Sequence, residues 1–154
     1  RTRLYRLETL TAPPAPDGAA RTATIGDREL LLRWTDAFHD DIGERGQDIA
    51  RQVDDLLEFG GMTVWESGGE PVSMAGRSRA SAGMARILSV YTPPDRRGRG
   101  YGGAATVAAT EAALAEGVTD VVLFTDLANP TSNGLYQRLG YRPVEDRTVV
   151  RFSA

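Results

Sequence analysis

The sequence contains no cysteine and no lysine, and its only histidine is His39. Without cysteine, the chain can form no disulfide, no thiolate zinc site and no cysteine nucleophile. Without lysine, it cannot carry the Gly-Lys-Ser/Thr end of the Walker A phosphate loop. A single histidine is too few for a histidine-based metal cluster, so we expect no metal site.

Long hydrophobic runs are also missing, because no apolar segment approaches the roughly 20 residues of a membrane-spanning helix. No signal peptide is visible, so we expect a cytoplasmic protein with no membrane partner. The net charge of −3 and the isoelectric point of about 5.2 argue against a nucleic acid as the partner. What remains is a chain of 154 residues, 41% hydrophobic and 25% charged, which is ordinary for one globular domain.

The first 18 residues differ in character from the rest. Residues 3–10 alternate enough to predict a short strand, and the proline-rich residues 12–18 are typical of a linker. A strand set apart by such a linker suggests that further sequence lies upstream. We therefore divide the chain into residues 1–18, interpreted as the end of an upstream region, and a domain over residues 19–154.

Hydrophobic periodicity and turn residues predict the elements of that domain. Strands are expected at residues 19–23, 62–67, 70–77, 84–91, 121–125 and 141–152. Helices are expected at residues 27–42, 49–57, an alanine-rich segment ending at 116–117, and a segment from Asn129 to Gly140. This order indicates a single α/β domain on a mostly antiparallel sheet. The buried face of the alanine-rich helix is expected to contain Ala104, Val107, Ala108, Ala112 and Ala115.

Residues 93–103, between the strand 84–91 and the alanine-rich helix, combine prolines, glycines and arginines. Glycines let backbone N–H groups approach a ligand closely, and the N–H groups at a helix start are unpaired beside the positive end of the helix dipole. Such a place binds phosphate, and Arg96, Arg97 and Arg99 add positive charge around it. We therefore predict an anion-binding loop here.

One phosphate-loop pattern in this segment is that of dinucleotide-binding folds. Gly98, Gly100 and Gly103 spell G-x-G-x-x-G, and Asp126 ends the next strand as a ribose-binding acid would. In those folds, however, the strand runs almost straight into the first glycine, whereas residues 93–97 intervene here. The dinucleotide pattern is therefore the weaker match.

The better match is Arg-x-x-Gly-x-Gly, formed by Arg97, Gly100 and Gly102. After a strand that ends Val-Tyr-Thr-Pro-Pro, this pattern resembles the acetyl-CoA pyrophosphate loop of the GCN5-related N-acetyltransferases, the GNAT superfamily. Residues 129–141, Asn-x-x-Ser-x-x-Leu-Tyr-x-x-x-Gly-Tyr, are similar to a second motif of that family, Asn-x-x-Ala/Ser-x-x-x-Tyr-x-x-x-Gly-Phe/Tyr. Two independent motifs in the right order are far more specific than either alone.

The resemblance implies that the central strands, 84–91 and 121–125, splay apart between flanking helices. It also implies that acetyl-CoA binds there, with its pantetheine arm along the open edge of the first strand and its pyrophosphate on the glycine loop. The residues at matching cofactor-binding positions are Val90, Tyr91, Thr92, Arg97, Gly98, Arg99, Gly100, Tyr101, Gly102, Gly103, Asn129 and Ser132. Asn129 can equally act only as a helix cap, and Ser132 can bond either the ligand or the helix backbone.

The implied activity is transfer of an acetyl group from acetyl-CoA to a primary amine, by direct attack in a ternary complex. Tyr136 matches the family's catalytic acid, and a purely structural role as a core aromatic residue stays open. The base is unassigned, with Glu66, Asp126 and Ser89 acting through a water as candidates. His39 is expected to be a surface or structural residue.

The acceptor is expected to be a small-molecule or peptide amine. Between residues 27 and 58, ten acidic residues against four arginines leave a net charge of −6, which would attract cationic amines if these helices border the acceptor entrance, as the resemblance implies. Ordinary solvated helix faces explain the same charges. A homodimer is an open option. Two other functions are alternatives: a non-catalytic acyl-CoA-binding module and an NAD-dependent oxidoreductase.

Overall fold

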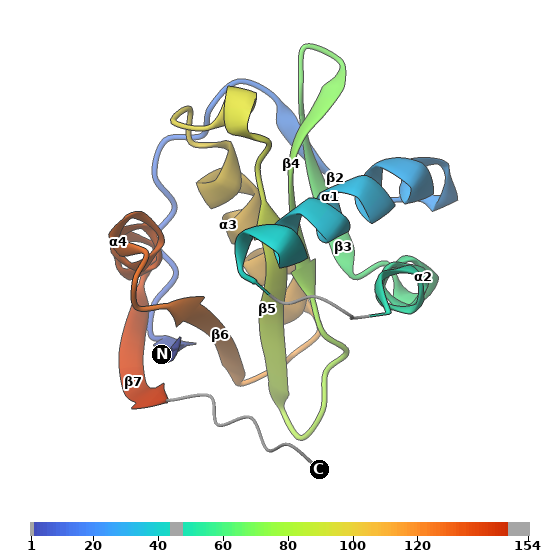
Figure 1. Cartoon of the computed structure of the whole chain (residues 1–154). Helices are drawn as coiled ribbons and strands as arrows, with labels where there is room; N and C mark the ends of the chain where they lie inside the picture. The colour runs from blue at the N-terminus through green and yellow to red at the C-terminus, as the bar shows by residue number, and fades with distance from the viewer. Residues whose placement is uncertain (1, 44–47, 148–154) are drawn as a thin grey trace.

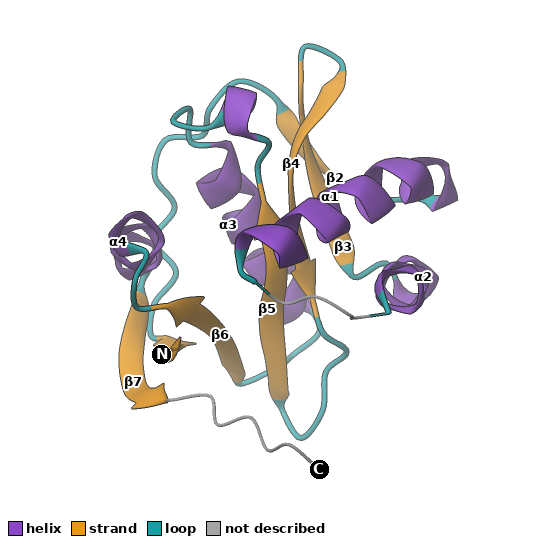
Figure 2. Cartoon of the chain, viewed as in Figure 1, coloured by secondary structure: helices purple, strands orange, loops and turns teal. Residues whose placement is uncertain are grey.

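The strands of the chain join one mixed sheet. In the computed structural model, which describes residues 2–43 and 48–147, the strand order is β2-β3-β4-β5-β6-β1-β7 (Figures 1 and 2). Neighbouring strands are antiparallel except β5 and β6, which are parallel. The expected single α/β domain on a mostly antiparallel sheet is confirmed. The strands are β1 (Thr2–Leu7), β2 (Ala19–Thr22), β3 (Met62–Ser67), β4 (Glu70–Arg77), β5 (Met84–Tyr91), β6 (Asp120–Asp126) and β7 (Tyr141–Arg147).

Helices cover both faces of this sheet (Figure 1). Short 3-10 turns at Ile25–Asp27 (η1) and Pro94–Arg96 (η2) follow β2 and β5, and the α-helices are α1 (Arg28–Asp41), α2 (Ile49–Phe59), α3 (Tyr101–Ala115) and α4 (Pro130–Leu139). One apolar core lies between the sheet and the pair α1 and α2, and a second lies between the sheet and the pair α3 and α4. Each fully buried aliphatic side chain in these cores stabilises the fold by about 1.5–3 kcal/mol.

Turn and cap residues end the elements where the sequence predicts. The hairpin between β3 and β4 turns at Gly68 and Gly69, with φ angles of 62° and 80° that favour glycine. Gly60 and Gly140 end α2 and α4 in the left-handed conformation, with φ of 72° and 106°. The predicted bounds of β3, β4 and β5 match the structure residue for residue, whereas residues 148–152 of the predicted last strand lie outside the described part.

The buried face of α3 is not the expected one. Of the five residues expected there, only Val107 is buried, together with Tyr101, Gly103, Ala105, Thr106, Ala109, Thr110 and Ala113. Alanine occurs all around this helix, so hydrophobic periodicity could not identify the inward face. Two threonines can lie inward because the Thr106 and Thr110 hydroxyls donate hydrogen bonds to backbone carbonyls four residues earlier, each at 2.8 Å.

The first strand lies inside the sheet rather than at its edge. β1 pairs antiparallel with β6 on one side and with β7 on the other. The linker then runs back along α4, where the Thr11 N–H donates to the carbonyl of Leu139 at 2.8 Å. It ends beside β3, where the Trp65 indole donates to the carbonyl of Asp17 at 2.9 Å. Residues 2–7 therefore share a sheet with the segment 19–147, and the expected boundary at residue 18 stays a prediction.

A β-bulge near the end of β5 changes which face its side chains occupy. Between the paired positions Leu88 and Tyr91, β5 has two residues, Ser89 and Val90, where β4 has one. Ser89 adopts a left-handed φ of 51°, which is uncommon for serine. As a result, Val90 packs against the core beneath α3, and Tyr91 packs in the core beneath α1.

The two central strands separate soon after they begin. Residues 84–86 of β5 pair with residues 120–122 of β6, and no further pair joins these strands within the described sheet. From residue 87 onward, the β6-facing edge of β5 therefore has no strand partner, and the strands diverge (Figure 1). The expected splay of the central strands is confirmed.

Candidate cofactor-binding and catalytic site

The loop that follows the free edge of β5 presents a run of unpaired backbone donors. The first hydrogen bond of α3 joins the Ala104 N–H to the carbonyl of Gly100 at 3.0 Å. The N–H groups of residues 98–103 donate to no acceptor among the described residues. They lie at the positive end of a 15-residue helix, so an anion placed there would meet both hydrogen-bond donors and a favourable dipole.

Glycines leave four positions of this loop, 98, 100, 102 and 103, without a side chain. Gly98 and Gly100 have φ angles of 80° and 84°, which disfavour other residues. A Cβ atom at Gly98 would meet nothing within 4 Å, and one at Gly100 would lie 4.0 Å from Pro16 of the linker. At these glycines the backbone is uncovered, which allows close approach of a phosphate.

Ser73 of β4 holds the start of the loop through two contacts with the end of β5 and Thr92. The Ser73 hydroxyl donates to the carbonyl of Tyr91 at 3.0 Å and lies 2.8 Å from the Thr92 hydroxyl. Close packing holds the other end of the loop, since a Cβ at Gly102 would lie 3.2 Å from the Thr92 hydroxyl and one at Gly103 3.2 Å from Leu135 of α4. These contacts bring the end of β5, the start of α3 and the helix α4 together.

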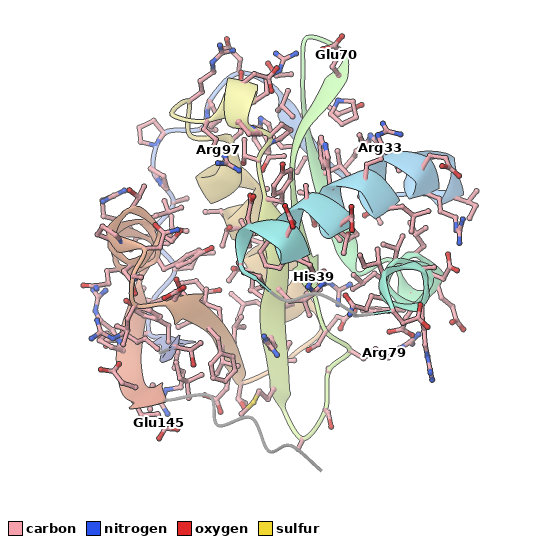
Figure 3. The ribbon with its side chains drawn as sticks, in the orientation of Figure 1. Arg33, His39, Glu70, Arg79, Arg97 and Glu145 are labelled. Atoms are coloured by element: carbon pink, nitrogen blue, oxygen red, sulfur yellow. The ribbon has the colours of Figure 1, made fainter. Side chains whose placement is uncertain are left out.

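The three loop arginines differ in what they already contact. Arg97 donates from Nε to the carbonyl of Thr92 at 2.8 Å and from Nη2 to Asp41 of α1 at 3.3 Å (Figure 3). Arg96 forms an ion pair with Glu70 at 2.9 Å. Arg99 is exposed and has no ion pair or side-chain hydrogen bond with residues 2–43 or 48–147. Arg99 is thus the loop cation available to a ligand, whereas Arg97 braces the turn.

The predicted cofactor residues of β5 point in different directions. Val90 lies on the side of α3, at the part of β5 without a β6 partner. The Tyr91 side chain packs on the opposite face, with its ring centroid 6.2 Å from that of Trp34. A role for Tyr91 toward a ligand in the splay would therefore involve its backbone, while its side chain anchors α1.

The first turn of α4 carries the other two predicted cofactor residues. Asn129 caps the helix, with its Oδ1 accepting from the Ser132 N–H at 3.1 Å. The Ser132 hydroxyl makes no hydrogen bond to the helix backbone in the described part of the chain. Of the two options for Ser132, bonding to the helix is therefore not used, and its hydroxyl remains available.

Tyr136 combines a buried ring with a hydroxyl that has no hydrogen-bond partner among the described residues. Its ring centroid lies 6.5 Å from that of Tyr5 and 6.3 Å from that of Tyr141, in the core beneath α3 and α4. Burial raises the pKa of Tyr136 above its usual range, so the phenol keeps its proton at neutral pH. The residue is 8% exposed, and its hydroxyl has no hydrogen bond to any described residue. The proton is therefore not committed to an acceptor within the described protein.

The candidate bases are held by local partners. The Glu66 carboxylate pairs with Arg21, with Oε1 and Nε 3.1 Å apart. Asp126, at the end of β6, accepts from the Ala128 N–H at 2.8 Å through Oδ1. Ser89 is largely buried at the bulge. Both carboxylates already have a partner, and Ser89 carries only a hydroxyl. None of the three is therefore a free carboxylate base beside the open edge of β5.

Other site types find little support in the described residues. His39 is buried, and its Nε2 lies 3.1 Å from Gln52 Oε1, which links α1 to α2. Over residues 2–43 and 48–147, acidic and histidine side chains form no group of three or more that could hold a metal ion. Within the same ranges, no helix is long and apolar enough to cross a bilayer.

Sequence reasoning missed a buried polar pair beneath α4. Tyr5 of β1 is fully buried and hydrogen-bonded to Asn133, which lies between Asn129 and Tyr136 on the inward face of α4. The available signal was the spacing, because Asn133 is four residues after Asn129 and three before Tyr136 and so shares their side of the helix. A polar residue at an inward position needs a buried partner.

Comparisons with known proteins agree with this architecture. A family model described as "Acetyltransferase (GNAT) family" matches residues 28–141. A GCN5-related N-acetyltransferase from Kribbella flavida is 25% identical, with a TM-score of 0.70 over 93% of this chain and 54% of that protein. One from Ralstonia eutropha JMP134 is 24% identical, with a TM-score of 0.64 over 86% of this chain and 97% of that protein. No curated protein sequence matches significantly.

The description of a further similar structure names a bound ligand. This structure is a predicted acetyltransferase with acetyl-CoA from Clostridium acetobutylicum, 16% identical, with a TM-score of 0.66 over 86% of this chain and 95% of that protein. At this identity the likeness shows the fold alone. The chain spans only 48% to 61% of the length of four similar structures, which are therefore much longer proteins.

The dinucleotide interpretation of Gly98, Gly100 and Gly103 does not fit the sheet. Dinucleotide-binding folds place the ligand at the ends of several parallel strands. Here β5 and β6 form the one parallel pair among the described strands, and they separate after three residues.

Proposed function

Because the chain belongs to the acetyltransferase (GNAT) family, we propose that it is an acetyl-CoA-dependent N-acetyltransferase acting on a primary amine by direct attack in a ternary complex. The observation that carries this proposal is the continuity of the free edge of β5 with the unpaired N–H groups of residues 98–103. An extended amide-bearing chain fits a free strand edge, and a pyrophosphate fits a helix start.

The residues present suit each part of acetyl-CoA. Val90 and Thr92 would offer backbone groups to the pantetheine amides, and the glycine-rich loop from Gly98 to Gly103 would take the pyrophosphate on its N–H groups. Arg99 would add an uncommitted positive charge. Asn129 and Ser132 would border the ligand from α4, which contacts α3 through Leu135 and Gly103.

Acetyl-CoA supplies a thioester whose acetyl carbon an amine can attack. A backbone N–H near Val90 or Thr92 would donate a hydrogen bond to the carbonyl oxygen as negative charge develops there. Tyr136 holds its proton at the hydroxyl and would donate a hydrogen bond to the departing thiolate sulfur as negative charge develops there. The amine proton must leave before attack, because a primary amine with a pKa near ~10.4 is mostly charged at neutral pH.

The acceptor is proposed to be a small-molecule or peptide amine. The acidic bias of residues 27–58 favours cationic amines, but ion pairs reduce it. Three arginines from outside this stretch neutralise part of it: Asp27 pairs with Arg21 at 2.7 Å, Asp55 with Arg79 at 3.1 Å, and Asp41 with Arg97. We therefore expect cationic acceptors to be favoured only modestly, and at low salt.

A non-catalytic acyl-CoA-binding module is the second candidate. The local partners of the Glu66 and Asp126 carboxylates favour it, because one oxygen of each is already held, by Arg21 and by the Ala128 N–H. Both candidates require CoA binding at the same loop, and only the first requires turnover.

Thermal unfolding with CoA, acetyl-CoA or NAD tests the ligand class. A ligand at about 100 times its dissociation constant stabilises the folded state by about 2.7 kcal/mol. For a chain of this size, that corresponds to a rise in Tm of roughly 5–10 °C. We expect this rise with CoA and acetyl-CoA and no rise with NAD. A rise with NAD alone would overturn the proposed function.

The loop arginines should contribute unequally to CoA affinity. We expect Arg99→Ala to raise the dissociation constant for CoA about tenfold, in keeping with the loss of one hydrogen bond to a charged group. Arg97→Ala should raise it only a few-fold, because Thr92 and Asp41 already occupy that guanidinium. Arg33→Ala removes the same charge from the exposed side of α1, away from the loop, and is the matched control (Figure 3). Calorimetry that ranks Arg97→Ala above Arg99→Ala would contradict this assignment.

A further inference from the structure

A buried hydrogen-bond cluster joins the first strand of the chain to α4. The Tyr5 hydroxyl donates to Asn133 Oδ1 at 2.6 Å. The Asn133 Nδ2 donates to the carbonyls of Asp126 at 2.9 Å and Asn129 at 2.7 Å. The Gln137 side chain donates back to the Tyr5 hydroxyl at 3.3 Å. The Asn133 side chain therefore joins β1, the end of β6 and the cap of α4, and the Tyr5 hydroxyl is the contact from β1.

This cluster determines how the start of α4 sits on the sheet. Asp126 is the last residue of β6 and Asn129 is the cap of α4, so the Asn133 amide closes the turn between them. Tyr5 is fully buried, and Asn133 is 8% exposed. Hydrogen bonds in such a dry place are directional and costly to leave unmade, so they hold the turn in one arrangement.

Tyr136 depends on that arrangement because its own hydroxyl is not anchored. No described residue accepts from it or donates to it, so ring packing sets where it points. One of the two rings that pack against Tyr136 is that of Tyr5, at 6.5 Å. Asn133 lies three residues earlier on the same helix, so a shift of Asn133 carries Tyr136 with it.

We propose that Tyr5 and Asn133 are positioning residues for acetyl transfer: they fix α4 so that the Tyr136 hydroxyl faces the reacting thioester. This inference rests on the proposed function. It gives the first strand, residues 2–7, a part in the reaction although no residue of that strand is proposed to touch a substrate.

The test is a double-mutant cycle of Tyr5→Phe and Tyr136→Phe, with turnover of acetyl-CoA measured on an accepted amine. Tyr5→Phe keeps the ring and removes only the hydroxyl. We expect it to lower kcat about tenfold, since misplacement by a fraction of an ångström is costly at a reacting centre. In the Tyr136→Phe background, where no hydroxyl remains to be positioned, Tyr5→Phe should lower kcat less than about twofold.

Tyr141→Phe is the matched control. Tyr141 is also fully buried, its ring lies 6.3 Å from that of Tyr136, and its hydroxyl is 2.7 Å from the Thr110 hydroxyl of α3. The Tyr141→Phe variant thus loses a comparable buried hydrogen bond, but one that makes no contact with the start of α4. We expect Tyr141→Phe to lower Tm about as much as Tyr5→Phe and to change kcat less than about twofold.

Asn133→Leu provides a second arm, because it removes the partner instead of the Tyr5 hydroxyl. It should show the same loss of kcat and the same dependence on Tyr136. An equal loss from Tyr5→Phe in both backgrounds, or an equal loss from Tyr5→Phe and Tyr141→Phe, would overturn the positioning role. A full-speed Tyr136→Phe variant with a slow Tyr5→Phe variant would overturn it too. A folded wild-type protein that acetylates no amine would instead overturn the proposed function, and this inference with it.

Discussion

Replacing Tyr136 by phenylalanine should lower the turnover of acetyl-CoA about 100-fold, while the Michaelis constant for acetyl-CoA stays nearly constant. The leaving thiolate has a thiol-like pKa of ~8.5 and a phenol ordinarily one near ~10, so full proton transfer is uphill. Burial raises the pKa of Tyr136 further, which keeps the proton in place at neutral pH but weakens the acid. Its help must therefore come as a hydrogen bond that strengthens as negative charge develops on sulfur.

Steady-state kinetics of the purified variant, with its Tm measured, decides this prediction. The phenylalanine ring preserves the contacts with Tyr5 and Tyr141, and the lost hydroxyl has no partner among the described residues. Stability and CoA affinity should consequently be almost unchanged. A variant that turns over within a few-fold of wild type would show that Tyr136 is only a core aromatic residue.

The largest loss of CoA affinity is expected from Gly100→Val, at about 100-fold or more. Gly100 is the cap of α3, with a φ of 84°, and a Cβ there would meet only Pro16 of the linker, at 4.0 Å. A valine there would cover the unpaired N–H groups of residues 101–103 and would strain the backbone by roughly 1–3 kcal/mol. Both effects oppose the approach of a pyrophosphate to the helix start.

The Gly117→Val variant distinguishes backbone strain from the covering of the N–H groups of the loop. Gly117 follows the opposite end of α3, has a φ of 86°, and a Cβ there would meet nothing within 4 Å. It carries the same backbone strain at a position far along the helix from the loop. Calorimetry should find normal CoA affinity in Gly117→Val and little or none in Gly100→Val, with similar Tm values. Unchanged affinity in a folded Gly100→Val protein would show that the loop is not the pyrophosphate site.

Elements bounded by strong turn residues could be predicted from the sequence almost to the residue. Gly68 and Gly69 fix the hairpin between β3 and β4 because they adopt positive φ angles that other residues avoid. The Asn129-Pro130 start and the Gly140 end of α4 are likewise local signals, and the structure shows both caps. The splay followed only from the family resemblance, since it depends on which strands pair.

Features that depend on contacts between distant parts of the chain could not be predicted from the sequence. The alternation in residues 3–10 indicates a strand but carries no information about its neighbours, so the insertion of β1 between β6 and β7 could not be predicted. The bulge at Ser89 leaves no signal in the sequence either, because serine rarely adopts a positive φ angle. The commitment of Arg97 to Thr92 and Asp41 arises from tertiary packing, which a loop sequence does not show.

The central claim is that this chain moves an acetyl group to an amine, and product stoichiometry tests it most directly. The protein would be incubated with acetyl-CoA and a panel of polyamines, amino acids, aminosugars, and basic and neutral peptides. Released CoA thiol and acetylated amine would then be quantified by mass spectrometry. We predict one acetylated amine for each CoA released, with both lost in the Gly100→Val variant and retained in Gly117→Val. Saturable CoA binding without an acetylated amine anywhere in the panel would contradict the account and leave a binding module.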